Sequence, residues 1–220
     1  MNRILRETPL RREQYSPPVQ ASASSTSRAK RTLDIVFAAI GLIVFLPVLI
    51  AATILIRLES RGPIIYRQKR GGLMGETFNI YKFRTMHVVE EASDVKHAVR
   101  NDPRLTAVGS FLRKSSFDEL PQLINILKGD MSIVGPRPHA LAHDEYYASQ
   151  IPAYRARMGA KPGLTGLAQV SGYRGDIPNI EAMVDRVACD LDYIDNWSLR
   201  LDLQLLFLTV VRFPFDPHAY

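Results

Sequence analysis

The sequence contains a single cysteine, Cys189, among its 220 residues. One thiol excludes an internal disulfide, and a chain this poor in cysteine fits a reducing compartment. The sequence also lacks the pattern of a cleaved signal peptide, because its first long apolar run begins only near residue 33 and is too long for a signal sequence. A secreted domain stabilised by disulfides is therefore not expected.

Beyond residue 32 the chain has little excess charge of either sign. The formal net charge is +6, and residues 1–32 alone contain seven Lys or Arg against two Asp or Glu. This distribution argues against nucleic acid as a partner and favours a basic tail near an anionic surface. Small polar residues without a pattern predict that residues 1–29 form a disordered tail.

The 22 residues from Ile35 to Ile56 include no charged side chain. As one helix they would be about 33 Å long, enough to cross a bilayer core of about 30 Å. The alternative is a buried core helix. Pro47 predicts a break in the middle, and basic residues flank both ends. Residues 30–60 are therefore predicted to form a re-entrant helix-break-helix in the membrane, with both ends in the cytoplasm.

The remaining residues, 61–220, are predicted to form a small cytosolic catalytic domain. Apolar spacing predicts that it is mostly helical with short strands, so the expected fold class is α+β. Helices are expected over 105–114, 118–129, 180–196 and 199–213, and strands over 64–68, 77–85, 131–134 and 167–170. The last helix is expected to be amphipathic and to lie either at a membrane interface or in the core.

Two adjacent carboxylates, Asp118 and Glu119, stand at the predicted start of the second helix of this domain. Asp118 suits the N-cap position, and an acidic residue at a helix start is most often only a cap. The alternative is a catalytic carboxylate close to the basic residues just upstream, Arg113 and Lys114.

Three further basic residues lie in patterns that suit phosphate binding. Lys82 and Arg84 share one face of a predicted strand, where they either hold a diphosphate or form a solvated edge. Arg137 lies between Pro136 and Pro138, which restrict its backbone, and a fixed guanidinium suits bidentate binding of phosphate. The alternative for that segment is a rigid turn whose arginine points to water.

Two histidines, His139 and His143, are four residues apart and could face together on a helix. No glutamate lies between them in the pattern of a zinc protease, so we interpret them as surface or supporting residues and not as metal ligands.

Taken in order, these segments resemble the bacterial sugar transferase family, the monotopic phosphoglycosyl transferases. The resemblance covers about residues 28–213 and rests on the proline-broken apolar segment and on the motifs KRTLD at 30–34, YKFRTM at 81–86, DE at 118–119, KGDMS at 128–132, GPRP at 135–138 and KPGLTG at 161–166. One difference is Leu167, where many members carry tryptophan, and it concerns only local packing.

The resemblance implies transfer of a hexose-1-phosphate, with glucose favoured, from a UDP-sugar to undecaprenyl phosphate with release of UMP. Such a reaction begins an exopolysaccharide or O-antigen repeat unit. The implied location is the bacterial inner membrane, among its lipids, with the catalytic domain facing the cytoplasm. Homo-oligomerisation stays open. The alternatives are a glycosyltransferase that releases UDP and a non-catalytic scaffold of polysaccharide assembly.

The resemblance also implies a role for each motif residue. Asp118 would be the nucleophile that forms a covalent aspartyl-phosphosugar, and Glu119 would be a ligand of Mg²⁺. Cations and a metal ion would offset the repulsion between a diphosphate and an attacking carboxylate, and the positive end of the following helix would keep Asp118 ionised. The positions implied in substrate binding are Lys82, Arg84, Arg113, Pro136, Arg137, Pro138 and Asp190.

Overall fold

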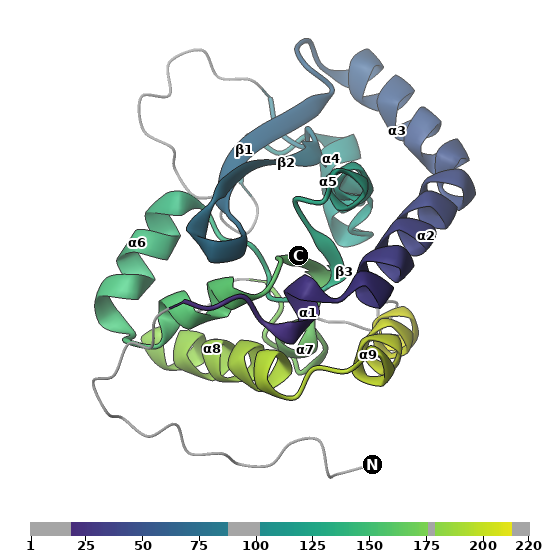
Figure 1. The fold of residues 1–220 in the computed structure, drawn as a ribbon. Helices are drawn as coiled ribbons and strands as arrows, with labels where there is room; N and C mark the ends of the chain where they lie inside the picture. The colour runs from purple at the N-terminus through teal and green to yellow at the C-terminus, as the bar shows by residue number, and fades with distance from the viewer. Residues whose placement is uncertain (1–18, 88–101, 176–178, 213–220) are drawn as a thin grey trace.

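A computed structural model describes residues 19–87, 102–175 and 179–212 of the chain. Most of the predicted tail, residues 1–18, lies outside these ranges. The described part is α+β, mostly helical with two small sheets, as the sequence predicted (Figure 1). Its elements are α1 (Ala23–Thr26), α2 (Arg28–Val44), α3 (Leu46–Glu59), β1 (Ile65–Gly71), η1 (Leu73–Gly75), β2 (Thr77–Phe83), α4 (Ala107–Lys114), η2 (Phe117–Glu119), α5 (Gln122–Lys128), β3 (Ser132–Val134), α6 (Leu141–Gln150), η3 (Tyr154–Gly159), β4 (Gly163–Thr165), α7 (Leu167–Val170), α8 (Ile180–Asp195) and α9 (Leu199–Arg212).

The apolar segment forms two helices, α2 and α3, with a bend of 60° between their axes. The predicted break is present, but it lies at Phe45, and Pro47 occupies the first turn of α3. Proline is tolerated there because its missing N–H has no partner within the helix. No single described helix is long and apolar enough to cross a membrane, whereas α2 and α3 together are, by length and composition.

The predicted disorder of residues 1–29 is wrong for its described part. The Ser22 N–H donates to the Gly159 carbonyl at 2.8 Å, and the Ser24 side chain is buried. Ser27 then caps α2, which begins at Arg28 and not at residue 30. Composition did not reveal this order, because it depends on backbone hydrogen bonds to η3, which lies far along the sequence.

The predicted strands at 64–68 and 77–85 form the antiparallel hairpin of β1 and β2, in which Tyr66 pairs with Lys82. The strand predicted at 131–134 is β3, which pairs in parallel with β4. The strand predicted at 167–170 is wrong: those residues form the helical turn α7, and the strand lies just before it. Gly166 lets the backbone after β4 pass close to Gly135, since a Cβ there would lie 2.2 Å from the Gly135 carbonyl oxygen.

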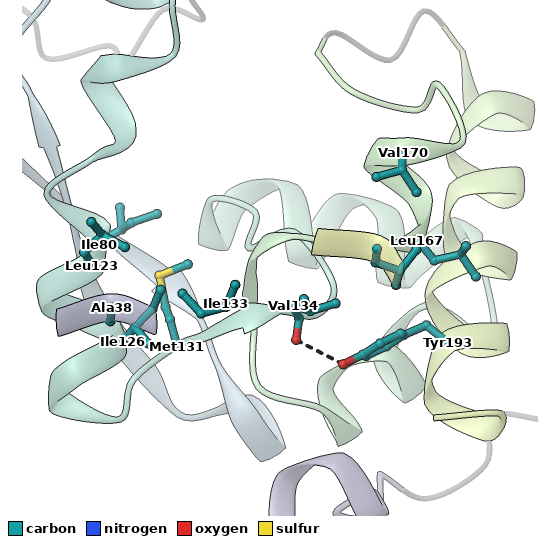
Figure 2. Packing of buried hydrophobic residues seen from close by; sticks show 11 residues of the cluster. Ala38, Ile80, Leu123, Ile126, Met131, Ile133, Val134, Leu167, Val170 and Tyr193 are labelled. Atoms are coloured by element: carbon teal, nitrogen blue, oxygen red, sulfur yellow. Dashed lines mark hydrogen bonds between the residues drawn. The ribbon is translucent and has the colours of Figure 1, made fainter. Parts of the chain in front are cut away.

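The main core surrounds β3 (Figure 2). Ile126 from α5 and Ala38 from α2 are fully buried on one side, and Leu167 and Tyr193 lie on the other. The Tyr193 hydroxyl donates to the Val134 carbonyl at 3.0 Å, as the dashed line in Figure 2 shows. Truncating Ile126 to alanine would cost about 2–5 kcal/mol. This packing fixes the end of β3, from which the Pro-Arg-Pro segment continues.

The helix α5 and the neighbouring α4 lie on the inner side of the angle between α2 and α3 (Figure 1). A second apolar cluster joins α3 to α4 through Ala52, Ile56 and Leu112. The segment with the two adjacent carboxylates, between α4 and α5, therefore lies beside the apolar helix pair.

Candidate active site

Asp118 and Glu119 lie in η2, a short 3₁₀ turn, and not at the start of α5. The predicted N-cap role of Asp118 is therefore wrong, because α5 begins only after Pro121. The Leu120 N–H bonds to the Phe117 carbonyl in the 3₁₀ pattern, and Pro121 has no N–H to continue it. Ser116, with a left-handed φ of 52°, turns the chain from α4 into this segment.

The Glu119 carboxylate is buried and paired with two cations. Lys82 Nζ lies 2.8 Å from its Oε1, and Arg137 binds both oxygens, at 2.6 Å and 3.2 Å. Burial alone would raise the pKa of Glu119, but Arg137 and Lys82 hold it well below its ordinary value. Glu119 is therefore ionised at neutral pH.

Asp118 is buried beside Glu119 in a different environment. It is 8% exposed, and among the described residues it accepts no hydrogen bond and forms no ion pair. Burial is the largest influence and raises the pKa of Asp118 to about 6, while Lys82 opposes the rise and the Glu119 carboxylate adds to it. A buried carboxylate that is ionised at neutral pH and has no bonded partner is suited to act as a nucleophile.

Of the other predicted basic residues, Arg113 lies near the carboxylate pair and Arg84 does not. Arg113, at the end of α4, acts electrostatically on Asp118, and its Nε donates to Thr85 Oγ1 at 2.9 Å. Arg84 follows the end of β2 and turns away. Its Nη2 donates to the carbonyl and hydroxyl of Ser60 at 2.8 Å and 2.9 Å, and it contacts neither carboxylate of the pair in the described structure. Arg84 is only 6% exposed and does not share the Glu119 contact of Lys82, so the pair does not form a solvated edge.

The Pro-Arg-Pro segment is held at three successive carbonyl groups. The carbonyl of Pro136 accepts from the Gly163 N–H at 2.8 Å, and that of Pro138 accepts from Arg70 Nη1 at 3.2 Å. Between them, Arg157 Nη2 donates to the Arg137 carbonyl at 2.6 Å. The backbone below the Arg137 guanidinium is thus fixed from three elements, and the guanidinium itself points to Glu119 and not to water.

Asp190 contacts the Pro-Arg-Pro segment indirectly, through Arg157. Its side chain is almost fully buried on α8 and accepts from Arg157 Nε and Nη2 at 2.9 Å and 2.8 Å. Because the same Nη2 also bonds the Arg137 carbonyl, Asp190 orients the arginine that supports Arg137. In the described structure this chain of contacts leads from Asp190 through Arg157 and Arg137 to Glu119.

Sequence reasoning missed Arg70 and Arg157. The position of Arg70 could have been predicted, since the β1–β2 register and a period of two place it on the same face of the hairpin as Lys82. Burial is the largest cause that lowers the pKa of Arg70, and Arg137 adds to it. Arg157 had no signal, because it lies in the irregular helix η3 and its partners come from elsewhere in the chain.

His139 is also buried, contrary to a position at the surface. Its Nδ1 lies 2.6 Å from the hydroxyl of Tyr154, and burial together with nearby arginines lowers its pKa well below the ordinary value. Among residues 19–87, 102–175 and 179–212, no group of three or more His, Cys, Asp or Glu side chains could hold a metal by itself. The predicted Mg²⁺ ligand, Glu119, is a single carboxylate, and proteins usually bind this ion through one or two carboxylates together with substrate phosphates.

Comparison with known proteins places this sequence in a family. The family description "Bacterial sugar transferase" matches residues 25–215. A Caulobacter vibrioides protein named UDP-glucose:undecaprenyl-phosphate glucose-1-phosphate transferase is 54% identical over 87% of this chain and 72% of its own length. An Escherichia coli protein of the same name is 48% identical over 87% of this chain, which spans 41% of that protein.

A third relative, the exopolysaccharide production protein PSS of Rhizobium leguminosarum, is 41% identical over 83% of this chain and 93% of its own length. The matched region contains both carboxylates, the cations around them and the Pro-Arg-Pro segment. The chain therefore belongs to the bacterial sugar transferase family, whose members are transferase enzymes.

Proposed function

We propose that this protein transfers a hexose-1-phosphate, glucose-1-phosphate in the first instance, from a UDP-sugar to undecaprenyl phosphate through a covalent intermediate on Asp118. The observation that carries the proposal is the contrast within one buried acidic pair. Glu119 is bonded to two cations, whereas Asp118 has cations nearby and no bonded partner. One carboxylate is thus available for attack, and the other keeps the cations in place.

In the first step, a carboxylate oxygen of Asp118 attacks the phosphorus that bears the sugar. The new O–P bond forms as the bond from that phosphorus to the bridging oxygen breaks, and UMP leaves with the bonding electron pair. Lys82, Arg113 and Arg137 act electrostatically on Asp118, next to the position where negative charge would accumulate on the diphosphate. Their positive charge lowers the barrier by stabilising the developing charge.

In the second step, a phosphate oxygen of the lipid acceptor attacks the same phosphorus. The aspartyl ester bond breaks, the Asp118 carboxylate is restored, and the sugar is joined to the lipid through a diphosphate. The same cations stabilise charge in both steps, which suits a site where two diphosphate-like transition states form in turn.

Glu119 would hold a magnesium ion together with oxygens of the diphosphate. Its lowered pKa keeps the carboxylate ionised, as a magnesium ligand must be. The bound ion would neutralise part of the charge on the diphosphate and the departing UMP.

The names of the relatives support the choice of substrates. Two of them are named for UDP-glucose and undecaprenyl phosphate, and one for exopolysaccharide production. We therefore propose that the product starts the assembly of a polysaccharide repeat unit.

The apolar surface supports a place at the bacterial inner membrane. The side chains of Ile43, Val44 and Leu58 on the helix pair are 73%, 62% and 79% exposed. On α9, Phe207 and Val210 are each 67% exposed and lie on one face, with the buried Leu205 turned inward. We propose that α2 and α3 enter and leave one leaflet, that α9 lies at its interface, and that the catalytic domain faces the cytoplasm.

The test is to incubate the protein with UDP-glucose and Mg²⁺ before any acceptor is added. We expect a burst of about one UMP per active site and an increase in intact protein mass equal to one hexose phosphate. Adding undecaprenyl phosphate should remove the adduct, and the Asp118→Asn variant should form none.

Other outcomes would support other functions. Release of UDP would indicate a glycosyltransferase that moves sugar without phosphate, and no nucleotide release would indicate a scaffold. UMP that appears only when the acceptor is present, with no adduct, would indicate direct attack by the lipid phosphate.

A further inference from the structure

Three phenylalanine rings connect the bend of the apolar helix pair to the proposed nucleophile. The ring centroids of Phe45 and Phe117 are 6.2 Å apart, and those of Phe111 and Phe117 are 6.4 Å apart. Phe45 is the residue at the break between α2 and α3, Phe111 lies on α4, and Phe117 directly precedes Asp118. We name Phe45, Phe111 and Phe117 the aromatic trio.

Core packing accounts for only part of the trio. Phe117 packs at the edge of the apolar cluster that joins α3 to α4. The Phe111 side chain, in contrast, is 61% exposed. Along the chain, Phe45 is flanked by the exposed side chains of Val44 and Leu46. An apolar surface therefore continues from the bend of the helix pair to within one residue of the buried carboxylate.

Asp118 thus lies between two kinds of surface. Lys82, Arg113 and Arg137 act on it electrostatically. Phe117 precedes it and contacts the two other rings of the trio. A ligand that reaches Asp118 along both surfaces must combine a negatively charged group with an apolar chain attached directly to it.

We propose that the aromatic trio binds the first isoprene units of the polyprenyl phosphate acceptor. The inference rests on the proposed function, because the second step brings the phosphate of this lipid to the phosphorus on Asp118. The chain leaves that phosphate within a few bonds of Phe117 and then passes Phe111 and Phe45 toward the apolar helix pair. Large aromatic rings offer extensive contact area to such a chain.

The test compares Phe111→Ala with Phe207→Ala in detergent micelles. Phe207, on α9, is similarly exposed and lies outside the trio. We expect Phe111→Ala to raise the KM for undecaprenyl phosphate about tenfold, as loss of part of one phenylalanine contact should. Phe207→Ala should leave that KM unchanged, and both variants should retain the burst of UMP with UDP-glucose alone.

Farnesyl phosphate, a short acceptor, locates the contact along the chain. If the trio binds the first units, Phe111→Ala should raise the KM for farnesyl phosphate by a similar factor, and Phe111→Trp should restore it. Phe45→Leu, which removes a ring but keeps an apolar side chain, should produce a smaller rise in the acceptor KM. This second variant keeps the test valid if Phe111→Ala fails to fold.

Two results would overturn the inference while leaving the proposed function intact. One is an unchanged acceptor KM in both Phe111→Ala and Phe45→Leu. The other is weaker retention in membranes for Phe111→Ala and Phe207→Ala alike with no change in acceptor KM, which would make the trio a bilayer anchor. Failure of the wild-type protein to release UMP from UDP-glucose would instead overturn the proposed function, and the trio assignment with it.

Discussion

Among the buried clusters of charged side chains in the described residues, two differ in how completely their carboxylates are bonded. One surrounds Asp118 and Glu119. The other, which we name the α2 clamp, consists of Lys30, Arg31, Asp34 and Asp202. Lys30 Nζ bonds Asp202 at 2.7 Å and the Val134 carbonyl at 3.0 Å. Asp34 Oδ1 accepts from the Ser132 hydroxyl and the Ile133 N–H, each at 2.9 Å.

The other contacts of the α2 clamp are hydrogen bonds to backbone carbonyls and to neighbouring side chains. Arg31 donates to the carbonyls of Ile126 and Leu127 at the end of α5. Asp202 also accepts from Tyr193 at 2.8 Å and from Trp197 at 3.0 Å. The clamp therefore ties the start of α2 to α5, β3 and α9. The charged groups of the clamp stabilise the packing of these elements. Asp118, which has no bonded partner, lowers the stability of the fold and is available to act as a nucleophile.

Asp118→Asn should produce the largest effect, a loss of turnover. The amide cannot form the phosphate ester, so we expect UMP release to fall by at least about a thousandfold. The fold should persist because Asp118 has no bonded partner to lose. Steady-state UMP release together with thermal unfolding measures both. Turnover close to that of the wild type would remove Asp118 from the mechanism.

Lys30→Met should produce the opposite pattern, with the largest effect on stability. It leaves the buried Asp202 carboxylate without its cation, which costs about 3 kcal/mol. Thermal unfolding in detergent measures the loss. Lys114→Met, at an exposed position on α4, is the matched control and should change little. If both variants had the same unfolding temperature as the wild type, the clamp would not stabilise the fold as we describe.

The pH dependence of stability should separate Asp118 from the paired carboxylates. Folding raises its pKa from 3.8 to about 6, so the ionised form opposes folding above pH 6, and the effect disappears below about pH 4. Asp118→Asn should therefore be about 3 kcal/mol more stable than the wild type at pH 7. The two unfolding temperatures should converge in acid. Equal stability at pH 7 would contradict a raised pKa.

Arg137→Lys should produce the smallest of the four effects, because the cation is kept. A lysine cannot reproduce the two bonds to Glu119, so we expect the KM for the UDP-sugar to rise about tenfold. Steady-state kinetics at saturating acceptor measures the change. Lys114→Arg is the control for a lysine–arginine exchange on the surface. A donor KM within twofold of the wild-type value would argue against a bidentate role.

Local periodicity in the sequence was enough to predict several elements. Apolar spacing predicted α8 and α9, alternation predicted the β1–β2 hairpin, and Pro47 predicted the break between α2 and α3. These features depend on residues close along the chain, whose preferences are strong and independent of distant partners. The motifs, through their resemblance to a family, also pointed to Asp118, Glu119 and Arg137, which the structure brings together.

Tertiary structure decided the features that depend on distant partners. Residues 167–170 form a helical turn because β4 takes the place beside β3, and Arg84 turns to Ser60 although its strand position suggested the active site. Arg70 and Arg157 support the Pro-Arg-Pro segment through bonds across the chain. Such bonds depend on which elements pack together, and burial then sets the different pKa values of Asp118 and Glu119, two neighbours that the sequence alone could not distinguish physically.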